Sequence, residues 1–129
     1  MNKNANILVV DDEEVVRLSY RRVLDTECNV AVATNGTEAL RAMEKHPYDV
    51  VLLDVRMPGM DGMAVLKTIK QKWPESEVVI ITGYPSVENA KEAVRLGAYD
   101  YLAKPLAPAE VVHAASAAMA QKEWALHCD

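Results

Sequence analysis

Five short apolar runs recur along the chain, and longer segments of mixed polarity separate them. The runs at residues 6–10, 49–54 and 77–82 are nearly continuous and rich in Val, Ile and Leu. Runs of this kind are typical of strands that are buried on both faces of a sheet. The runs at 28–33 and 99–104 include polar residues, and we interpret them as two further strands.

The segments between these runs carry apolar residues at helical spacing. The repeats comprise Val16, Tyr20, Val23 and Leu24; Ala39, Leu40 and Met43; Leu66, Ile69 and Trp73; Val87, Ala90 and Val94; and Val111, Ala115 and Ala118. Ser86 is predicted to cap the start of the fourth helix, and Gly97 to end it in the left-handed conformation. Each strand is therefore followed by a predicted helix.

This alternation predicts an α/β fold, namely a flavodoxin-like doubly wound (βα)5 domain. Strands that alternate with helices form a parallel sheet with right-handed crossovers, so that helices cover both faces. A five-stranded sheet of this length most often has the strand order 2-1-3-4-5. We expect residues 1–129 to form a single domain, with a core over 5–122 and a helical tail at 123–129.

Polar residues stand at the carboxyl ends of four of the predicted strands. Asp11 and Asp12 follow the first strand, Asp54 ends the third, Thr82 ends the fourth and Lys104 ends the fifth. In doubly wound sheets, ligands bind outside the carboxyl ends of the strands, at the switch point between the first and third strands. The predicted strand order therefore brings the three carboxylates together at one edge.

These residue types fit a metal-assisted phosphoryl site. Three carboxylates at close range repel one another, and a hard divalent cation such as Mg2+ removes that penalty. Asp is a nucleophile toward phosphoryl groups, while a lysine and a hydroxyl stabilise the oxygens of the group in transfer. Each residue taken alone also has an ordinary structural explanation: a helix cap for Asp11 or Asp12, a turn cap for Asp54, a strand residue for Thr82 and a solvated chain end for Lys104.

Four stretches together resemble the receiver domain of two-component response regulators. They are "ILVVDDE" (7–13), "VVLLDVRMPGMDG" (50–62), "VVIITGY" (78–84) and "GAYDYLAKPL" (97–106). The resemblance covers residues 5–122, and each stretch alone is a weak signal. Residues 82–106 are most similar to receivers of sigma-54-type transcription activators.

The resemblance implies a phosphorylation site with a bound metal. Asp54 resembles the aspartate that a sensor histidine kinase phosphorylates. Asp11 and Asp12 resemble the acidic pair that holds Mg2+ next to Asp54, and the backbone carbonyl of Arg56 falls where the family supplies a further metal ligand. Lys104 resembles the lysine that contacts the phosphoryl group, and in the family its bond to the following proline is frequently cis.

The resemblance also implies a conformational switch. Thr82 resembles the hydroxyl that moves toward the phosphoryl group, and Tyr101 the aromatic residue that turns inward as it moves. We expect this change to repack the surface formed by the helix after Ser86, the strand at 99–104 and the last helix at 108–129. That surface includes Val87, Lys91 and Arg95, and it is the expected contact in a homodimer.

Three residues near the site are variable in the family or depart from it. Leu106 stands where an aromatic residue is common, and Arg56 and Tyr84 occupy variable positions that flank the phosphoryl site. We expect Arg56 and Tyr84 to tune the lifetime of the phosphoryl group, because they admit or exclude the attacking water.

The composition narrows the range of partners. The formal net charge is -5 and no basic stripe is present, which argues against nucleic-acid binding by this domain. No apolar run approaches the roughly 20 residues that span a bilayer, and the first residues lack a secretory signal. We therefore expect a cytoplasmic domain without membrane contact, whose partners are a sensor histidine kinase and an output domain or downstream effector in transcription regulation.

The predicted function is a phosphorylation-activated switch rather than an enzyme, with Mg2+-dependent autophosphorylation from small phosphodonors and autodephosphorylation. The main alternative is a phosphohydrolase of the haloacid dehalogenase type, which also uses an Asp nucleophile at a strand end. That chemistry requires a second Asp two residues further on, where this chain has Arg56. A nucleotide- or flavin-binding module is another alternative, but no GxGxxG or Walker A loop follows the first strand.

Overall fold

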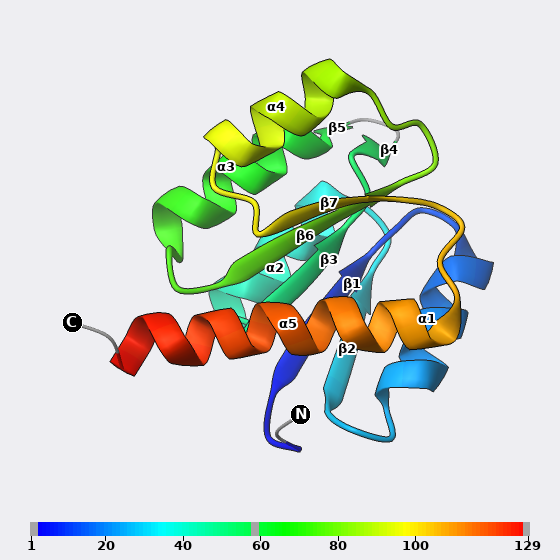
Figure 1. The fold of residues 1–129 in the computed structure, drawn as a ribbon, viewed down its shortest axis with the longest axis vertical. Helices are drawn as coiled ribbons and strands as arrows, with labels where there is room; N and C mark the ends of the chain where they lie inside the picture. The colour runs from blue at the N-terminus through cyan, green and yellow to red at the C-terminus, as the bar shows by residue number, and fades with distance from the viewer. Residues whose placement is uncertain (1–2, 58–59, 128–129) are drawn as a thin grey trace.

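The computed structural model describes residues 3–57 and 60–127, with the backbone alone described for residues 56, 57 and 60. These residues form a five-stranded parallel sheet in the order β2-β1-β3-β6-β7 (Figure 1). Its strands are β1 (Asn6–Val10), β2 (Asn29–Ala33), β3 (Val50–Leu53), β6 (Glu77–Thr82) and β7 (Asp100–Ala103). The strand order predicted from the sequence is confirmed.

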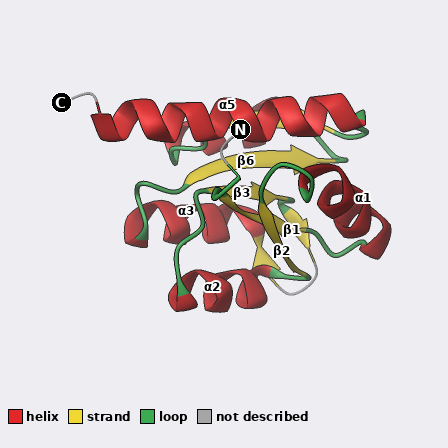
Figure 2. Cartoon of the chain, turned by 90° about the horizontal axis from the view of Figure 1, so that it is seen from below, coloured by secondary structure: helices red, strands yellow, loops and turns green. Residues whose placement is uncertain are grey.

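The described helices cover both faces of the sheet. They are α1 (Glu14–Leu24), α2 (Gly36–Lys45), α3 (Gly62–Lys72), α4 (Val87–Arg95) and α5 (Pro108–His127). Helices α1 and α5 pack on one face, and α2 and α3 on the other, with α4 next to α3 (Figures 1 and 2). Residues 123–127 continue α5, whereas 128 and 129 lie outside the described residues. None of the described helices is long and apolar enough to cross a bilayer.

The central strands are buried because they carry apolar side chains on both faces. Residues 7–10 of β1 and 50–53 of β3 are at most 2% exposed. Each fully buried Val, Leu or Ile side chain contributes roughly 1.5–3 kcal/mol relative to an exposed one. The edge strands β2 and β7 are only partly buried, which agrees with the polar residues in their sequences.

Three observed strands are shorter than the apolar runs that predicted them. Cys28 precedes β2 instead of lying within it, Asp54 follows β3, and Lys104 follows β7. The backbone nevertheless continues the ladder: the N–H of Asp54 donates to the carbonyl of Val10 at 3.0 Å, and that of Lys104 to Thr82 at 2.8 Å. Both polar side chains are thus delivered just past the end of a strand.

The loop after Asp54 contains a short hairpin that the sequence did not predict. Strand β4 (Arg56–Met57) pairs antiparallel with β5 (Met60–Asp61). The connection between them, residues 58–59, lies outside the described residues. The described residues on either side of this connection are therefore paired as strands.

Gly62 begins α3 in close contact with Val55. A Cβ added at Gly62 would lie 2.2 Å from the Cα of Val55, closer than side-chain atoms approach a backbone. The N–H of Gly62 donates to the carbonyl of Val55 at 3.2 Å. Asp61 caps the helix, because its side chain accepts a hydrogen bond from the N–H of Met63 at 2.9 Å. A glycine is therefore required where α3 starts.

Both predicted signals at the ends of α4 are confirmed. The Ser86 hydroxyl accepts a hydrogen bond from the N–H of Asn89 at 3.1 Å. Gly97 has a φ of 98°, in the left-handed region that favours glycine. These two residues fix the limits of the helix.

The apolar stripe of α4 faces away from the core. Such a stripe usually packs against the sheet, but Val87 and Val94 are 71% and 70% exposed, while Ala93 is the buried residue of the helix. The spacing of the valines predicts a helix correctly without showing which way the stripe points. The outward valines leave an apolar surface on α4.

Candidate functional site at the carboxyl edge of the sheet

The carboxyl ends of β1 and β3 lie side by side. Val10 pairs with Leu53 in the sheet register, so Asp11 and Asp54, the residues that follow them, are neighbours. Both are buried, with Asp11 3% and Asp54 6% exposed. Two buried carboxylates repel each other and are poorly solvated, so the site requires positive charge.

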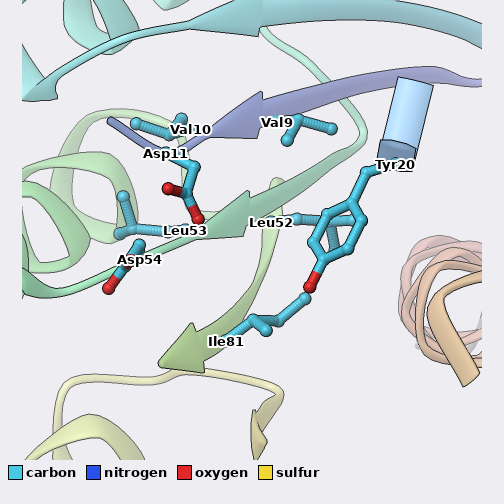
Figure 3. A pocket seen from close by; sticks show the side chains of 8 residues that line it. All are labelled: Val9, Val10, Asp11, Tyr20, Leu52, Leu53, Asp54 and Ile81. Carbon is cyan, nitrogen blue, oxygen red and sulfur yellow. The ribbon is translucent and has the colours of Figure 1, made fainter. Parts of the chain in front are cut away.

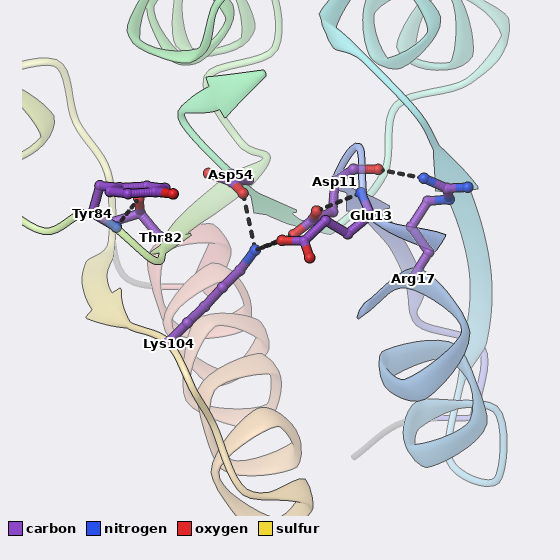
Figure 4. Close-up of polar contacts among 7 residues, drawn as sticks. All are labelled: Asp11, Glu13, Arg17, Asp54, Thr82, Tyr84 and Lys104. Carbon is purple, nitrogen blue, oxygen red and sulfur yellow. Dashed lines mark hydrogen bonds and ion pairs between the residues drawn. The ribbon is translucent and has the colours of Figure 1, made fainter. Parts of the chain in front are cut away.

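Lys104 supplies positive charge from the end of β7 (Figure 4). Its Nζ lies 2.6 Å from Oδ2 of Asp11, 2.9 Å from Oδ2 of Asp54 and 3.6 Å from Oε1 of Glu13. Burial by itself lowers the pKa of the Lys104 ammonium, but the hydrogen bonds and charges of Asp11 and Asp54 outweigh burial and hold that pKa above its ordinary value. The ammonium therefore stays charged and joins the two buried acids.

Asp12 adds an exposed carboxylate to the cluster. Carboxylate oxygens of Asp11, Asp12 and Asp54 lie within 4.8 Å of one another. The single charge of Lys104 leaves this group of three acids with an excess of negative charge. Magnesium prefers such hard oxygen ligands and keeps several of its waters, for which the exposed side leaves access. The residues present therefore fit a hard divalent cation.

A helix cap does not explain Asp12. Helix α1 begins after Glu13, and its N-cap makes no side-chain hydrogen bond. Within the part of the chain that the structure describes, Asp12 forms no hydrogen bond or ion pair. The side chain of Asp12 thus has no capping role in the described structure, and its role as a metal ligand stays a prediction.

Two residues that the sequence did not single out hold Asp11 in place. The N–H of Glu13 donates to Oδ1 of Asp11 at 2.9 Å, and the Arg17 guanidinium donates to the backbone carbonyl of Asp11 at 2.8 Å (Figure 4). Nothing in the sequence distinguishes Arg17 from the other arginines of α1. Because α1 begins directly after Glu13, the side chain of Arg17 lies close enough to the end of β1 to reach the Asp11 carbonyl.

Thr82 is fully buried at the end of β6, and its hydroxyl has a partner. Oγ1 of Thr82 accepts a hydrogen bond from the N–H of Tyr84 at 3.1 Å (Figure 4). The side chain of Tyr84 is exposed. A movement of the Thr82 hydroxyl toward Asp54 would therefore release the backbone between β6 and α4.

Tyr101 is bound to the start of α4. It is half-buried on β7, and its hydroxyl accepts a hydrogen bond from the N–H of Ser86 at 3.2 Å. The ring also packs against the core on the side of the sheet covered by α2 and α3. The predicted inward turn of Tyr101 would break the bond to Ser86.

Two further features of the site concern the backbone. The peptide bond between Lys104 and Pro105 is cis, as is frequent in the family that the sequence resembles. Arg56 begins β4, two residues after Asp54. Its side chain is not described, and the role of its carbonyl as a metal ligand remains a prediction.

Comparison with known proteins was made on both sequence and structure. A family model described as "Response regulator receiver domain" matches residues 7–116. The transcriptional regulatory protein ZraR of Escherichia coli is 46% identical over 108 residues, which cover 80% of this chain and 24% of ZraR. The chain spans about a fifth to a quarter of the length of the curated relatives it matches.

Solved structures agree with this match. NtrX from Brucella abortus, crystallised in complex with ADP, superposes with a TM-score of 0.86 at 35% identity, over 93% of this chain and 28% of that chain. A CheY-like receiver domain protein from Methanospirillum hungatei superposes with a TM-score of 0.90 at 27% identity, over 93% of this chain and 97% of that one.

Proposed function

The chain belongs to the response regulator receiver domain family, whose members act in phosphorylation-dependent two-component signalling, and we propose that Asp54 is the residue that a sensor histidine kinase phosphorylates. The observation that carries this proposal is the ammonium of Lys104, shared by Asp11 and Asp54 at 2.6 Å and 2.9 Å. A buried acid beside a charged lysine and two further carboxylates has the surroundings that phosphoryl transfer to a carboxylate requires.

In the proposed reaction, a carboxylate oxygen of Asp54 attacks the phosphorus of a phosphohistidine. The new P–O bond forms while the P–N bond breaks, and the imidazole nitrogen keeps the electron pair. Lys104 then exchanges its bonds to the two acids for a bond to a phosphoryl oxygen. The carboxylates of Asp11, Asp12 and Asp54 and the carbonyl of Arg56 would hold Mg2+, which would supply positive charge to neutralise the phosphoryl oxygens.

The same chemistry operates without the kinase. Asp54 accepts a phosphoryl group from a small acyl phosphate in the presence of Mg2+ and later loses it to water. Arg56 and Tyr84 flank the site and set the lifetime of the phosphoryl group. The position of Tyr84 beside the site supports this role, since its N–H donates to Oγ1 of Thr82 at 3.1 Å.

Phosphorylation acts as a switch through Thr82. The phosphoryl group adds about 1.5–2 negative charges and three acceptor oxygens, so the Thr82 hydroxyl gains a new acceptor and leaves the N–H of Tyr84. Tyr101 turns into the space that Thr82 vacates and gives up its bond to Ser86. A shift from 1:99 to 99:1 between two states requires roughly 5.5 kcal/mol of differential stabilisation, within reach of several charge-assisted bonds.

The surface formed by α4, β7 and α5 changes on phosphorylation and contacts the next protein or domain in the signalling pathway. Val87 and Val94 are exposed on α4, and the hydroxyl of Tyr101 accepts a hydrogen bond from Ser86 at the start of that helix. This surface pairs two copies of the domain or contacts an output domain, and transcription regulation is the outcome suggested by relatives such as ZraR. We place the domain, residues 1–129, in the cytoplasm, without direct binding to nucleic acid or membrane.

Intact-mass spectrometry after incubation with acetyl phosphate and Mg2+ tests the proposal. Wild type is expected to gain one phosphoryl group that is lost on standing at alkaline pH. Asp54→Asn should gain none, while the control Asp25→Asn, which alters an exposed acid at the end of α1, should behave as wild type. Phosphorylation that persists in Asp54→Asn, or sustained hydrolysis of a phosphomonoester as in a phosphohydrolase, would refute it.

A further inference from the structure

Arg17 differs from its neighbour Arg21 on α1 in the group that it binds. Arg21 pairs with the carboxylate of Asp25 at 3.6 Å, and both side chains are about half exposed. Arg17 is half-buried and, within the described residues, forms no ion pair; its guanidinium donates to the backbone carbonyl of Asp11 at 2.8 Å (Figure 4). A guanidinium that binds a carbonyl in this way fixes the orientation of a peptide group.

The carbonyl of Asp11 lies past the end of the sheet ladder. The N–H of Asp11 still donates to the carbonyl of Ala33 at 3.2 Å, but the described residues provide no backbone donor to the carbonyl of Asp11 itself. Asp11 is buried, and a buried carbonyl without a donor is unfavourable. Arg17 therefore supplies the missing donor and holds the peptide group between Asp11 and Asp12.

The orientation of Asp12 depends on this peptide group. A carboxylate oxygen of Asp12 lies within 4.8 Å of those of Asp11 and Asp54. The side chain of Asp11 is held by two hydrogen bonds, whereas that of Asp12 forms none within the described part of the chain. The Asp12 carboxylate therefore faces the cluster because of its backbone, which Arg17 holds.

A hydrated cation can reach the acids from the side of Asp12. Beneath Asp11 and Asp54 lies a narrow crevice, which apolar side chains and Tyr20 line and which has no room for a water molecule (Figure 3). Asp12 is exposed on the other side. Because Mg2+ keeps several of its waters in protein sites, it approaches from the exposed side, and the direction of the Asp12 carboxylate matters for its binding.

We propose that Arg17 is a positioning residue of the metal site, which holds the peptide between Asp11 and Asp12 so that the Asp12 carboxylate faces the cation. The inference rests on the proposed function and deepens its metal site. It also predicts the sign of an effect. A guanidinium repels Mg2+, so its charge alone would make removal of Arg17 strengthen binding, whereas loss of the hydrogen bond to the peptide weakens binding.

A Mg2+ titration of the full chain, followed by NMR through the amide signals around Asp54, tests this role. Arg17→Met is compared with wild type and with the control Arg21→Met, which removes the same charge from the same helix. We expect about tenfold weaker binding in Arg17→Met, as is usual when an outer hydrogen bond of a metal site is lost. Arg21→Met should bind as tightly as wild type or slightly more tightly. If Arg17→Met does not fold, Arg17→Gln, which is equally neutral, provides the same comparison.

A second pair of variants separates positioning from a general loosening of the domain. Because Arg17 is proposed to act through Asp12, the further change Arg17→Met should weaken binding little in a chain that already carries Asp12→Asn. A general loosening would weaken binding equally in both backgrounds, and that result overturns the inference. Equal or tighter binding in Arg17→Met than in Arg21→Met also overturns it.

Failure of the inference can be distinguished from failure of the proposed function. Uptake of a phosphoryl group by Asp54 is measured separately by mass spectrometry. If wild type binds Mg2+ and is phosphorylated while Arg17→Met binds Mg2+ as tightly, the inference alone fails. If wild type binds no Mg2+ near Asp54, the metal site of the proposed function fails, and this inference with it.

Discussion

The ammonium of Lys104 lies 2.6 Å from Oδ2 of Asp11 and 2.9 Å from Oδ2 of Asp54, residues that are 93 and 50 positions away in the chain. This contact ties together the ends of three strands of the sheet. It also holds the proposed phosphoacceptor. If Asp54 is the phosphoacceptor, as we propose, stability and signalling depend on the same three side chains.

Replacement of Lys104 should destabilise the domain in a way that Mg2+ corrects. Lys104→Met leaves Asp11 and Asp54 buried without their cation, and removal of one partner from a buried ion pair costs about 3–5 kcal/mol. We expect a loss of that order in the free energy of unfolding without Mg2+. Added Mg2+ should restore part of the loss, because it neutralises the same carboxylates. Urea unfolding with and without Mg2+ measures both effects.

Lys122→Met is the control for this experiment. Lys122 pairs with Asp49, and the two side chains are 15% and 20% exposed, a degree of burial close to that of Lys104 at 14%. The pair joins α5 to the amino end of β3, away from the acidic cluster. Its loss should also destabilise the domain, but without recovery in Mg2+. Recovery in both variants, or in neither, would contradict the explanation.

The placement of the site residues at one edge could be predicted because a parallel sheet constrains it. The carboxyl ends of parallel strands share one edge, so the strand order alone makes Asp11 and Asp54 neighbours and puts Lys104 at the same edge. The apolar runs identified the strands and their alternation with helices, and the order followed from the arrangement that is commonest for five-stranded doubly wound sheets. The topology of the sheet can therefore be predicted from the order of strands and helices, without knowledge of side-chain contacts.

Contacts across elements could not be predicted in the same way. Arg17 reaches the Asp11 carbonyl because of the angle at which α1 leaves β1, and the spacing of residues does not encode that angle. The stripe of Val87 and Val94 on α4 faces solvent because the small Ala93 occupies the packed side. The hairpin after Asp54 rests on the close approach of Gly62 to Val55, which depends on tertiary structure.

Gly62→Ala should be strongly destabilising. The new methyl group would lie 2.2 Å from the Cα of Val55, and a backbone atom cannot move aside as the end of a flexible side chain can. We expect a loss of about 1–3 kcal/mol or more in the free energy of unfolding. Gly83→Ala is the control, since the nearest atom to its Cβ is the Cδ of Lys104 at 3.9 Å, an ordinary contact. Similar denaturation midpoints for the two variants would rule out the clash.

Cys28 should make stability fall at alkaline pH. Burial raises the pKa of the Cys28 thiol from 9.0 to about 11, so the folded state favours the protonated form. The stabilisation is complete below pH 9, where the unfolded chain also keeps the proton, and is lost as the pH rises toward 11. Wild type should therefore lose more stability over this range than Cys28→Ala. Chemical unfolding at a series of pH values provides the two slopes, and parallel slopes would contradict the prediction.

Thr82→Val should separate phosphorylation from the response to it. Valine keeps the shape of the buried side chain but cannot hydrogen-bond to the phosphoryl group, and it also loses the bond from the N–H of Tyr84. We expect phosphorylation of Asp54 to persist while the signals of Tyr101 and α4 stay near their resting positions in NMR spectra. Thr68→Val, on the exposed side of α3, is the control and should respond as wild type does. A full response in Thr82→Val would remove Thr82 from the switch.

The exposed valines of α4 should support association of the activated domain. Val94 is 70% exposed on the surface proposed to change, and a glutamate there would place a charge in any apolar contact. Val94→Glu is therefore expected to take up beryllofluoride as wild type does but to remain monomeric in sedimentation experiments in which activated wild type forms dimers. Val15→Glu changes a valine that is 76% exposed on α1, so it introduces the same charge on another face. Because both substitutions alter an exposed valine, loss of dimers in Val94→Glu alone would assign the contact to α4, whereas equal dimerisation of the two variants would exclude α4 from it.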